Sequence, residues 1–385
     1  MNKTLLISEI FPPIHGGSGR WFWELYSRLP RDEYLIIAGS NANTDEFDTT
    51  HDLNIKRINL SSESWGIKSV TGISFYWRTF WQLKKQIKEN KITQIHCGRC
   101  LPEGVMGWLL SLFTGIPFIC YVHGEDVETA STSRELTWLV KKVLNSATKL
   151  ISNSKNTANI LINNWQAQQE KVVVLNPGCD TTKFVPAEKD LNVRKELGWE
   201  DRTVILTVGR LQQRKGHDMM IKALPKIKDI HPDVLYAIVG NGEEKPALQT
   251  LVTELNLEDN VMFHAEITDQ EMIQCYQQCD LFILPNRTVG NDIEGFGMVL
   301  VEAQSCSKPV IAGDSGGTAE TMLIGDSGYV LDCTNTEVMS NAISDLLTDK
   351  PLIKSMGEMG REHVVNTLDW QAHKEKASQL FQSVK

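Results

Sequence analysis

Residues 292–303 have the sequence Asp-Ile-Glu-Gly-Phe-Gly-Met-Val-Leu-Val-Glu-Ala, which holds two glycines between two glutamates. The apolar run 281–284 precedes them and is typical of a buried parallel strand. Residues 298–305 are predicted to form a helix, with a further strand after it. Gly295 and Gly297 would then lie where a loop enters a helix. The unpaired N–H groups and positive end of such a helix favour a phosphate, and glycine lets a ligand approach the backbone closely.

Two carboxylates frame this glycine turn. Glu294 precedes it and Glu302 lies inside the predicted helix, with seven residues between them. A carboxylate is repelled by a phosphate, but it accepts hydrogen bonds from both hydroxyls of a diol. The pattern therefore fits a nucleoside diphosphate sugar, which carries diols on both sides of its phosphates. It also fits a glycine-rich helix start with two solvated acids, because short motifs match by chance.

The segment from Glu294 to Glu302 resembles the E-x7-E motif of family-four retaining glycosyltransferases, which have the GT-B fold. The resemblance continues through residues 309–320, where it is especially similar to the PimB-like phosphatidylinositol mannosyltransferase subgroup. It implies that Glu302 holds the ribose diol and that Glu294 contacts the donor sugar. The backbone between them would hold the diphosphate. The residues implied there are Gly295, Phe296, Gly297, Met298 and Val299.

The composition is that of a soluble globular protein with room for two domains. The chain has 385 residues, of which 41% are hydrophobic and 23% charged. No apolar stretch reaches the roughly 18 residues needed to span a bilayer, and residues 1–11 lack the apolar region of a signal peptide. The eight cysteines show no disulfide framework. We therefore expect a reducing, cytoplasmic location.

The net charge of −9 is unevenly distributed along the chain. Residues 1–180 carry 19 basic and 17 acidic side chains, a net charge of +2, which leaves −11 for residues 181–385. A nucleic-acid-binding protein normally has a strong basic field, so no nucleic-acid partner is expected. An anionic surface would meet the N-terminal half.

A second glycine-rich loop, residues 10–19, separates a predicted strand at the N-terminus from a predicted helix over residues 20–29. This order is the phosphate-approaching turn of a doubly wound domain, although the G-x-G-x-x-G pattern is missing and paired glycines also suit an ordinary turn. The resemblance places Gly16 and Gly17 beside the donor phosphates. The PimB-like pattern has an acid where this chain has Ile10, so the role of that acid does not transfer.

The segment 68–91 combines basic and aromatic residues. A helix is predicted over residues 75–91. The segment contains six Lys or Arg residues and a single acid, Glu89. Such a helix is typical of a membrane-surface element, but also of a domain helix that buries its aromatics and solvates its lysines. The first interpretation implies peripheral contact with the inner face of a membrane through this segment. Both interpretations are open.

The apolar run 117–122 predicts a buried strand that ends at His123. Ligands collect at that edge of open α/β sheets. A lone histidine usually has a structural role, but the resemblance implies that His123 contacts the donor sugar.

Residues 126–128 form D-x-E rather than the D-x-D of metal-dependent GT-A enzymes, so no metal and no cofactor besides the donor are expected. Cys97 and Cys100 form a single C-x-x-C pair. Zinc usually needs four ligands, so a zinc site is not expected there.

A predicted strand over residues 204–209 opens the second domain and leads into a basic loop. Arg210 and Lys215 in this loop match the family pattern G-R-x4-K-G, which implies a clamp on the donor diphosphate. Without the resemblance, a basic loop is usually solvated surface. Two cations at this place would stabilise charge on the leaving diphosphate without a metal. The resemblance also places the loop that ends at Ile267 near the nucleotide base.

The resemblance covers nearly the whole chain. We predict the α/β GT-B fold, with two Rossmann-like doubly wound domains facing a central cleft. The bounds are an acceptor-side domain over 1–180, a nucleotide-sugar domain over 181–364, and a helix over 365–385 that crosses back. The predicted reaction is retaining transfer of mannose or glucose, from a donor of the GDP-mannose or UDP-glucose type, to an acceptor hydroxyl on a lipid-linked or polysaccharide glycan. The alternative is a GT-B nucleotide-sugar epimerase or hydrolase, or a non-catalytic nucleotide-sugar-binding protein.

Overall fold

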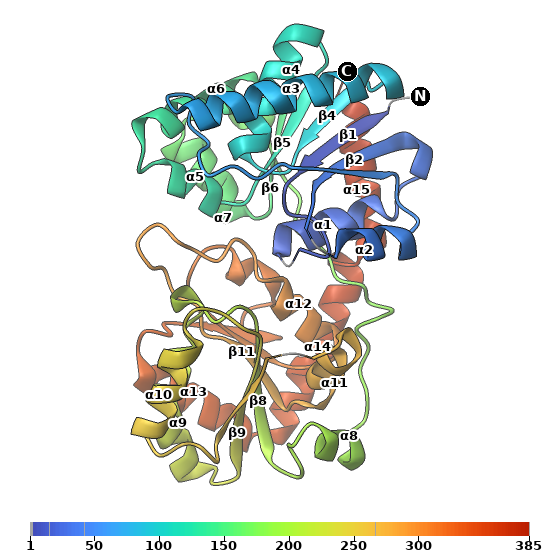
Figure 1. Ribbon diagram of the computed structural model, residues 1–385. Coiled ribbons are helices and arrows are strands. Elements are labelled where there is room, and N and C mark those ends of the chain that lie inside the picture. The colour runs from blue at the N-terminus through green and yellow to red at the C-terminus, as the bar shows by residue number, and fades with distance from the viewer. Residues whose placement is uncertain (1–2, 15, 42, 266, 385) are drawn as a thin grey trace. The chain divides into compact units, whose positions relative to one another are not determined.

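The computed structural model describes residues 3–14, 16–41, 43–265 and 267–384. The chain divides into two compact units, one of Met1–Pro177 with Trp370–Lys385 and one of Gly178–Asp369. Each unit contains a parallel sheet with helices packed around it (Figure 1). The predicted α/β class with two Rossmann-like domains is confirmed.

The sheet of the first unit has the strand order β3-β2-β1-β4-β5-β6-β7 within the described residues. Its strands are β1 (Thr4–Ser8), β2 (Tyr34–Gly39), β3 (Ile55–Ile58), β4 (Gln94–Cys97), β5 (Phe118–Val122), β6 (Lys149–Ser152) and β7 (Val172–Val174). Leu5 lies opposite Leu35 of β2 on one side and Ile95 of β4 on the other, in parallel register. Strand order reverses at the β1–β4 pair, and ligands of doubly wound folds bind at such a point.

Helices cover both faces of this sheet. They are α1 (Gly17–Tyr26), α2 (Thr44–Thr50), α3 (Val70–Asn90), α4 (Val105–Thr114), α5 (Glu125–Ala130), α6 (Arg134–Ser146), α7 (Lys155–Asn159) and α15 (Trp370–Ser383). Because side chains alternate along a strand, Leu5 of β1 joins the core under α3, α4 and α6, whereas Leu6 joins the core with α1 and α15. The short helical turns of the chain are η1 (Arg31–Glu33), η2 (Cys100–Gly104), η3 (Ile160–Asn164), η4 (Gln169–Lys171), η5 (Gln213–Lys215) and η6 (Thr318–Thr321).

Two predicted helix starts were wrong. Helix α3 begins at Val70 rather than residue 75, because the Ser69 side chain accepts a hydrogen bond from the Gly72 N–H and caps the helix. Helix α1 begins at Gly17, with Gly16 as its N-cap. Glycine is a poor helix former, so the sequence pattern pointed to a start further along the chain.

Helix α15 packs on the first unit. The buried Trp21 indole N–H donates to His373 Nε2 over 3.0 Å, and His373 Nδ1 lies 2.7 Å from the Asn176 carbonyl oxygen. Burial lowers the pKa of His373 to about 3, so the ring is neutral and can donate from Nδ1 while it accepts at Nε2. The prediction from sequence put the domain boundary after residue 180 and the returning segment at 365. The units divide at 177 and 369, where the Cys179 N–H donates to the Leu368 carbonyl.

The second unit has the strand order β10-β9-β8-β11-β12-β13 within its described residues. Its strands are β8 (Thr203–Val208), β9 (Val234–Val239), β10 (Val261–His264), β11 (Leu281–Leu284), β12 (Val310–Gly313) and β13 (Gly328–Leu331). Its helices are α8 (Leu191–Glu196), α9 (His217–Ile230), α10 (Lys245–Glu254), α11 (Asp269–Gln278), α12 (Met298–Ser305), α13 (Thr336–Thr348) and α14 (Lys350–Thr367). The predicted strand 281–284 and helix 298–305 are confirmed. Here strand order reverses at β8–β11, so the loops after these two strands come together.

The cysteines are core residues. All eight are free thiols and all are buried. Cys275 and Cys279 lie in the core that α11 and α12 share. Cys97 and Cys100 lie in the core of the first unit, where the Cys100 and Cys120 sulfur atoms are 3.8 Å apart. These thiols therefore contribute to packing as small apolar side chains.

Candidate functional site

Glycine shapes the turn that leads into α12. Gly297 is the N-cap of α12 and has a φ of 94°, a left-handed conformation that glycine adopts without a steric penalty. Phe296 is 3% exposed and anchors the turn in the core, while Gly295 is half-buried. The N-cap makes no side-chain hydrogen bond to the helix. The first N–H groups of α12, at Met298 and Val299, therefore lie at a helix start of the kind that binds anions.

Two further glycines hold Glu294 in place. Gly316 has a φ of 71°, and a Cβ added to it would lie 1.8 Å from the Glu294 carbonyl oxygen. The Gly317 N–H donates to the same oxygen over 2.9 Å. The loop after β12 therefore presses directly on the Glu294 backbone, and only a residue without a side chain fits there.

Gly316→Ala should destabilise the second unit much more than Gly325→Ala. Both positions have left-handed backbones, which cost alanine about 1–2 kcal/mol. A Cβ at Gly325, whose φ is 90°, meets nothing within 4 Å, so Gly325→Ala is a matched control for backbone strain alone. Thermal unfolding of both variants measures the difference. Equal melting temperatures would show that the loop does not hold Glu294 as described.

The Glu294 carboxylate is buried between two cations. Its Oε2 accepts a hydrogen bond from Lys215 Nζ over 2.6 Å and another from Arg214 Nη1. Arg214 Nε also lies 3.1 Å from Asp292 Oδ1. Burial by itself raises the pKa of Glu294, but the charges of Lys215 and Arg214 outweigh it and lower the pKa. Glu294 is therefore ionised, and the cluster carries two positive and two negative side chains.

Lys215 reaches Glu294 because two loops of the sheet lie against each other. Lys215 ends η5, and Gly216 follows it with a φ of 73°. A Cβ on Gly216 would lie 1.8 Å from the Pro285 carbonyl oxygen, just after β11. This close approach places the β8–α9 loop on the β11–α12 loop. Sequence reasoning identified Lys215 but missed Arg214, whose only signal was its place directly before Lys215.

Arg210 has a different environment. Its side chain is exposed, so of the two predicted cations only Lys215 is buried against Glu294. The Arg210 carbonyl accepts a hydrogen bond from Nε2 of the buried His217 over 3.3 Å. Burial lowers the pKa of His217 to about 4, so this histidine is a neutral support for the loop. His217 was also missed from the sequence.

Glu302 lies inside α12, as predicted, and is 2% exposed. The Tyr276 hydroxyl of α11 donates to Glu302 Oε2 over 2.7 Å. Ile267, Met298 and Val299 are half-buried against the same core. Glu266, in the loop predicted near the base, lies outside the described residues. Lys215, Glu294, Ile267 and the residues of the glycine turn thus lie around α12 and the core that it joins.

His123 follows β5 at the edge of the first sheet. Its Nε2 lies 2.8 Å from the Gly98 carbonyl oxygen, and since a carbonyl only accepts, Nε2–H is the donor. The ring meets Trp21 and Phe22 of α1 edge to face, with centroids 5.8 and 6.0 Å apart. Nδ1 is left as the ring atom that can meet a ligand hydroxyl. Gly16 is the N-cap of the same helix α1, which begins at Gly17.

An ion cluster that sequence reasoning missed lies at the same sheet edge. Arg99, after β4, pairs with Glu9, after β1, and its Nε lies 3.0 Å from Glu103 Oε2. The Glu9 N–H donates to Glu103 Oε1 over 2.9 Å. Burial raises the pKa of Glu9 although Arg99 opposes it. An acid therefore stands one residue before Ile10, at the loop where the family pattern appeared to be broken.

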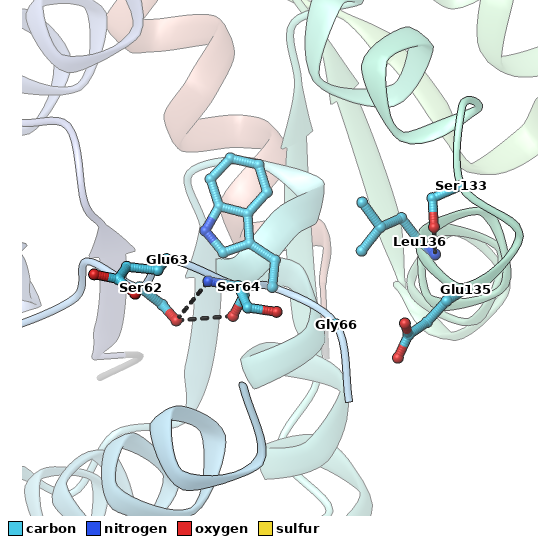
Figure 2. Close-up of a pocket in the computed structure, with 8 residues that line it drawn as sticks. Ser62, Glu63, Ser64, Gly66, Ser133, Glu135 and Leu136 are labelled. Carbon is cyan, nitrogen blue, oxygen red and sulfur yellow. Dashed lines mark hydrogen bonds between the residues drawn. The ribbon is translucent and has the colours of Figure 1, made fainter. Parts of the chain in front are cut away.

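A polar pocket of about 430 Å³ opens in the first unit, between the loop 62–66 and the start of α6. Figure 2 shows Ser62 and Ser64 on one side of it and Ser133 and Glu135 on the other. The Glu135 carboxylate accepts the Lys68 N–H over 2.7 Å, which ties the two sides together. The Trp65 ring in the loop is covered by the Arg99 guanidinium at 5.1 Å. The pocket therefore borders the Glu9–Arg99–Glu103 cluster and presents hydroxyls and carboxylates.

Comparisons with known proteins identify the family of the chain. The family description "Glycosyl transferases group 1" matches residues 189–363, and "Glycosyltransferase Family 4" matches residues 15–183. The chain is 30% identical to a GDP-mannose-dependent monoacylated alpha-(1-6)-phosphatidylinositol monomannoside mannosyltransferase of Corynebacterium glutamicum, over 99% of this chain and 98% of that protein. It is 28% identical to a GDP-mannose-dependent alpha-(1-6)-phosphatidylinositol monomannoside mannosyltransferase of Mycolicibacterium smegmatis, over 98% and 97%.

Solved structures share the fold. Anabaena Alr3699/HepE in complex with UDP and glucose superimposes with a TM-score of 0.84 at 20% identity, covering 100% of both chains. Sucrose-phosphate synthase from Thermosynechococcus elongatus gives a TM-score of 0.82 at 21% identity, covering 99% of this chain and 98% of the other. The chain therefore belongs to the group 1, family 4 glycosyltransferases of the GT-B fold and is a nucleotide-sugar-dependent glycosyltransferase.

Proposed function

We propose that this enzyme transfers mannose or glucose from a GDP-mannose- or UDP-glucose-type donor to a hydroxyl of a glycolipid, with retention. The observation that supports this proposal most is the buried Lys215–Glu294 pair at the glycine turn before α12. Glu302 lies within α12. The mannosyltransferase relatives favour mannose and a phosphatidylinositol-type acceptor, whereas the fold of HepE, solved with UDP and glucose, keeps glucose as the second donor. A polysaccharide acceptor is the less favoured choice.

We assign the donor contacts as follows. The first N–H groups of α12 hold the diphosphate, and Glu302 accepts from the ribose hydroxyls. An ammonium group has three N–H donors, so Lys215 can hold Glu294 and a phosphate oxygen together. Arg214 is a positioning residue, because it fixes Glu294. The remaining proposed contacts are Ile267 at the base, Arg210, Gly16 and Gly17 at the phosphates, and His123 at the sugar.

In the proposed reaction the bond between sugar C1 and the diphosphate oxygen breaks, and its electron pair goes to that oxygen. The acceptor oxygen bonds to C1 on the same face, and its proton passes to the departing phosphate. Lys215 stabilises the growing negative charge, and Glu294 stabilises the oxocarbenium-like sugar. Lys215 thus acts at the oxygen end of the breaking bond, and Glu294 acts at its C1 end. The facing of the two domains across a cleft stays a prediction.

Activity should survive excess EDTA. Lysine and helix N–H groups supply the positive potential that a metal would otherwise provide at the leaving group. Turnover of the purified enzyme is measured before and after chelation, with Mg²⁺ and Mn²⁺ added back. Loss of activity that either ion restores would mean that the leaving group is neutralised in another way.

We place the acceptor headgroup in the polar pocket of the first unit. Its serine hydroxyls donate and accept, while Glu63 and Glu135 accept from a diol and repel a phosphate. This combination suits a neutral polyol ring such as a sugar or a cyclitol. The predicted location of the enzyme at the inner face of the membrane would follow from such an acceptor. This location remains part of the proposal.

Glu135→Gln should raise the acceptor KM by roughly tenfold, the effect of losing one charge-assisted hydrogen bond. Glutamine keeps a carbonyl oxygen that can accept the Lys68 N–H, so the loop is retained. Glu170→Gln, at an exposed glutamate of the same unit, is the matched control. Steady-state kinetics with each substrate varied in turn provide the measurement. An unchanged acceptor KM in Glu135→Gln places the acceptor elsewhere.

The transfer itself is tested by screening UDP- and GDP-sugars for consumption, with and without a lipid extract, followed by mass spectrometry. A transferase consumes donor in an acceptor-dependent way and adds a hexose mass to a lipid. A hydrolase releases free hexose without an acceptor, and an epimerase returns an isomeric donor. A binding protein shows affinity without turnover. Any of the last three outcomes replaces the proposed function.

A further inference from the structure

Helix α15 buries a histidine on the side that packs against α1. The two helices lie beside each other in the first unit (Figure 1), and Ala377 and Phe381 of α15 join the apolar core there. His373, one turn before Ala377, is 5% exposed. An apolar side chain at this position would be enough to pack the helices, and burying a polar group costs free energy unless it is hydrogen-bonded. The contacts of His373 therefore indicate what this residue does.

The first contact leads to the His123 ring through Trp21. The buried Trp21 indole N–H donates to His373 Nε2 over 3.0 Å, so this donor has its acceptor. The Trp21 ring meets the His123 ring edge to face, with centroids 5.8 Å apart. Phe22, the next residue of α1, meets the His123 ring at 6.0 Å. His373 thus fixes the indole that borders the His123 ring.

The second contact leads to the His123 backbone through two asparagines. His373 donates from Nδ1 to the Asn176 carbonyl oxygen over 2.7 Å. The Asn176 amide donates to the Asn153 carbonyl over 3.0 Å, and the Asn153 amide donates to the His123 carbonyl over 3.3 Å. Asn153 is buried, and its Oδ1 accepts from the Thr157 hydroxyl over 2.8 Å, which orients the amide. These hydrogen bonds form a continuous chain from α15 to the end of β5.

A second buried anchor of α15 has a structural explanation. Gln94 of β4 donates from Nε2 to the Phe381 and Val384 carbonyl oxygens, over 3.1 and 3.4 Å. These carbonyls lie at the end of α15, where a helix has no partners of its own for its last carbonyl groups. Gln94 Oε1 accepts from the Nε2–H of the buried His96 over 2.7 Å. This anchor serves the end of the helix, whereas both contacts of His373 lead to His123.

We propose that His373 and Trp21 are positioning residues for His123 in the transfer reaction. His373 holds the Trp21 indole against the His123 ring. Through Asn176 and Asn153 it also holds the backbone that carries this ring. A fully satisfied buried polar network favours one arrangement of the groups it connects, which an apolar contact at residue 373 would not do. This role rests on the proposed contact between His123 and the donor sugar.

His373→Leu should lower kcat by about tenfold, less than the cost of displacing a reacting group by a full ångström. Bare nucleoside diphosphate lacks the sugar, so its Kd should stay as in the wild type. His373→Gln keeps a donor and an acceptor at the end of the side chain and should retain most of kcat. Gln94→Leu is the matched control, since it also removes buried hydrogen bonds of α15 and leaves the His96 N–H without its acceptor. This control should have the wild-type kcat.

Nitrogen NMR of the histidine side chains tests the positioning without turnover. Two-bond proton–nitrogen correlations, recorded at alkaline pH where histidines are neutral, show which ring nitrogen carries the proton. The His123→Gln variant assigns the His123 signals, and the wild type should have the proton on Nε2. His373→Leu and Trp21→Phe should shift or broaden these signals, whereas Gln94→Leu should leave them unchanged. Circular dichroism confirms that each variant is folded.

Unchanged His123 signals in both His373→Leu and Trp21→Phe overturn the proposal, and so does an unchanged kcat in both variants. Equal effects of Gln94→Leu would assign the changes to the packing of α15 in general, which also overturns it. A wild type that turns over no donor overturns the proposed function instead, and the His123 signals then decide the positioning alone.

Discussion

Lys215→Ala should lower the donor turnover by about a hundredfold, the upper end of the effect of losing a charged hydrogen-bond partner. The alanine variant loses the cation at the leaving diphosphate and one of the two partners of Glu294. Arg214 still pairs with Glu294, so the buried carboxylate keeps a counter-charge and the fold should persist. Steady-state kinetics and thermal unfolding together measure the two effects.

The matched control is Lys222→Ala, which removes an exposed lysine of α9 from the same unit. It should have wild-type kinetics. Arg210→Ala should cost about tenfold, the lower end for a charged contact, because the Arg210 side chain is exposed where Lys215 is buried. Wild-type turnover in Lys215→Ala contradicts the assigned role of this lysine.

Glu294→Gln should lower kcat by about a hundredfold, the scale of losing one electrostatic contact that strengthens in the transition state. Bare nucleoside diphosphate should bind this variant as well as it binds the wild type, or better. The reason is the cluster itself: without the Glu294 charge, Lys215 and Arg214 have more positive potential to offer a phosphate. The expected result is a catalytic defect without a binding defect.

Glu302→Gln should have the opposite signature. The ribose does not change during transfer, so its contact is nearly equal in the ground and transition states, and the main effect should be a higher donor Kd. Titrating the nucleoside diphosphate and the intact donor into both variants separates the two roles. If Glu294→Gln loses the bare nucleoside diphosphate while Glu302→Gln keeps it, the two roles are reversed.

The sequence was sufficient wherever one segment carries the whole pattern. The strand before the glycine turn, the turn and α12 follow one another in the chain, so local pattern alone places Gly297 at the turn and Glu302 in the helix. It places His123 at a strand end for the same reason. The sequence also predicted most of α3 as a helix, which has a buried and an exposed apolar side. Which of its two apolar sides enters the core depends on its neighbours α4 and α6, which no local pattern encodes.

The residues missed from the sequence depend on contacts between distant segments. Arg214 and Glu294 are 80 residues apart and meet only because β8 and β11 are neighbours in the sheet. Glu9 and Arg99 are 90 residues apart and meet because β1 pairs with β4. The helix start at Gly17 was missed because glycine is a poor helix former, and its place is fixed by the loop before it.

Proton NMR of a single reaction shows whether the enzyme transfers a hexose to a lipid with retention. The purified enzyme is mixed with GDP-mannose or UDP-glucose and a phosphatidylinositol mannoside acceptor, and the anomeric signals are recorded from the first minutes. With retaining transfer, nucleoside diphosphate and an α-linked hexosyl lipid should form in equal amounts, and Glu294→Gln should form both slowly. A β-linked product, or free hexose without a lipid product, would contradict it.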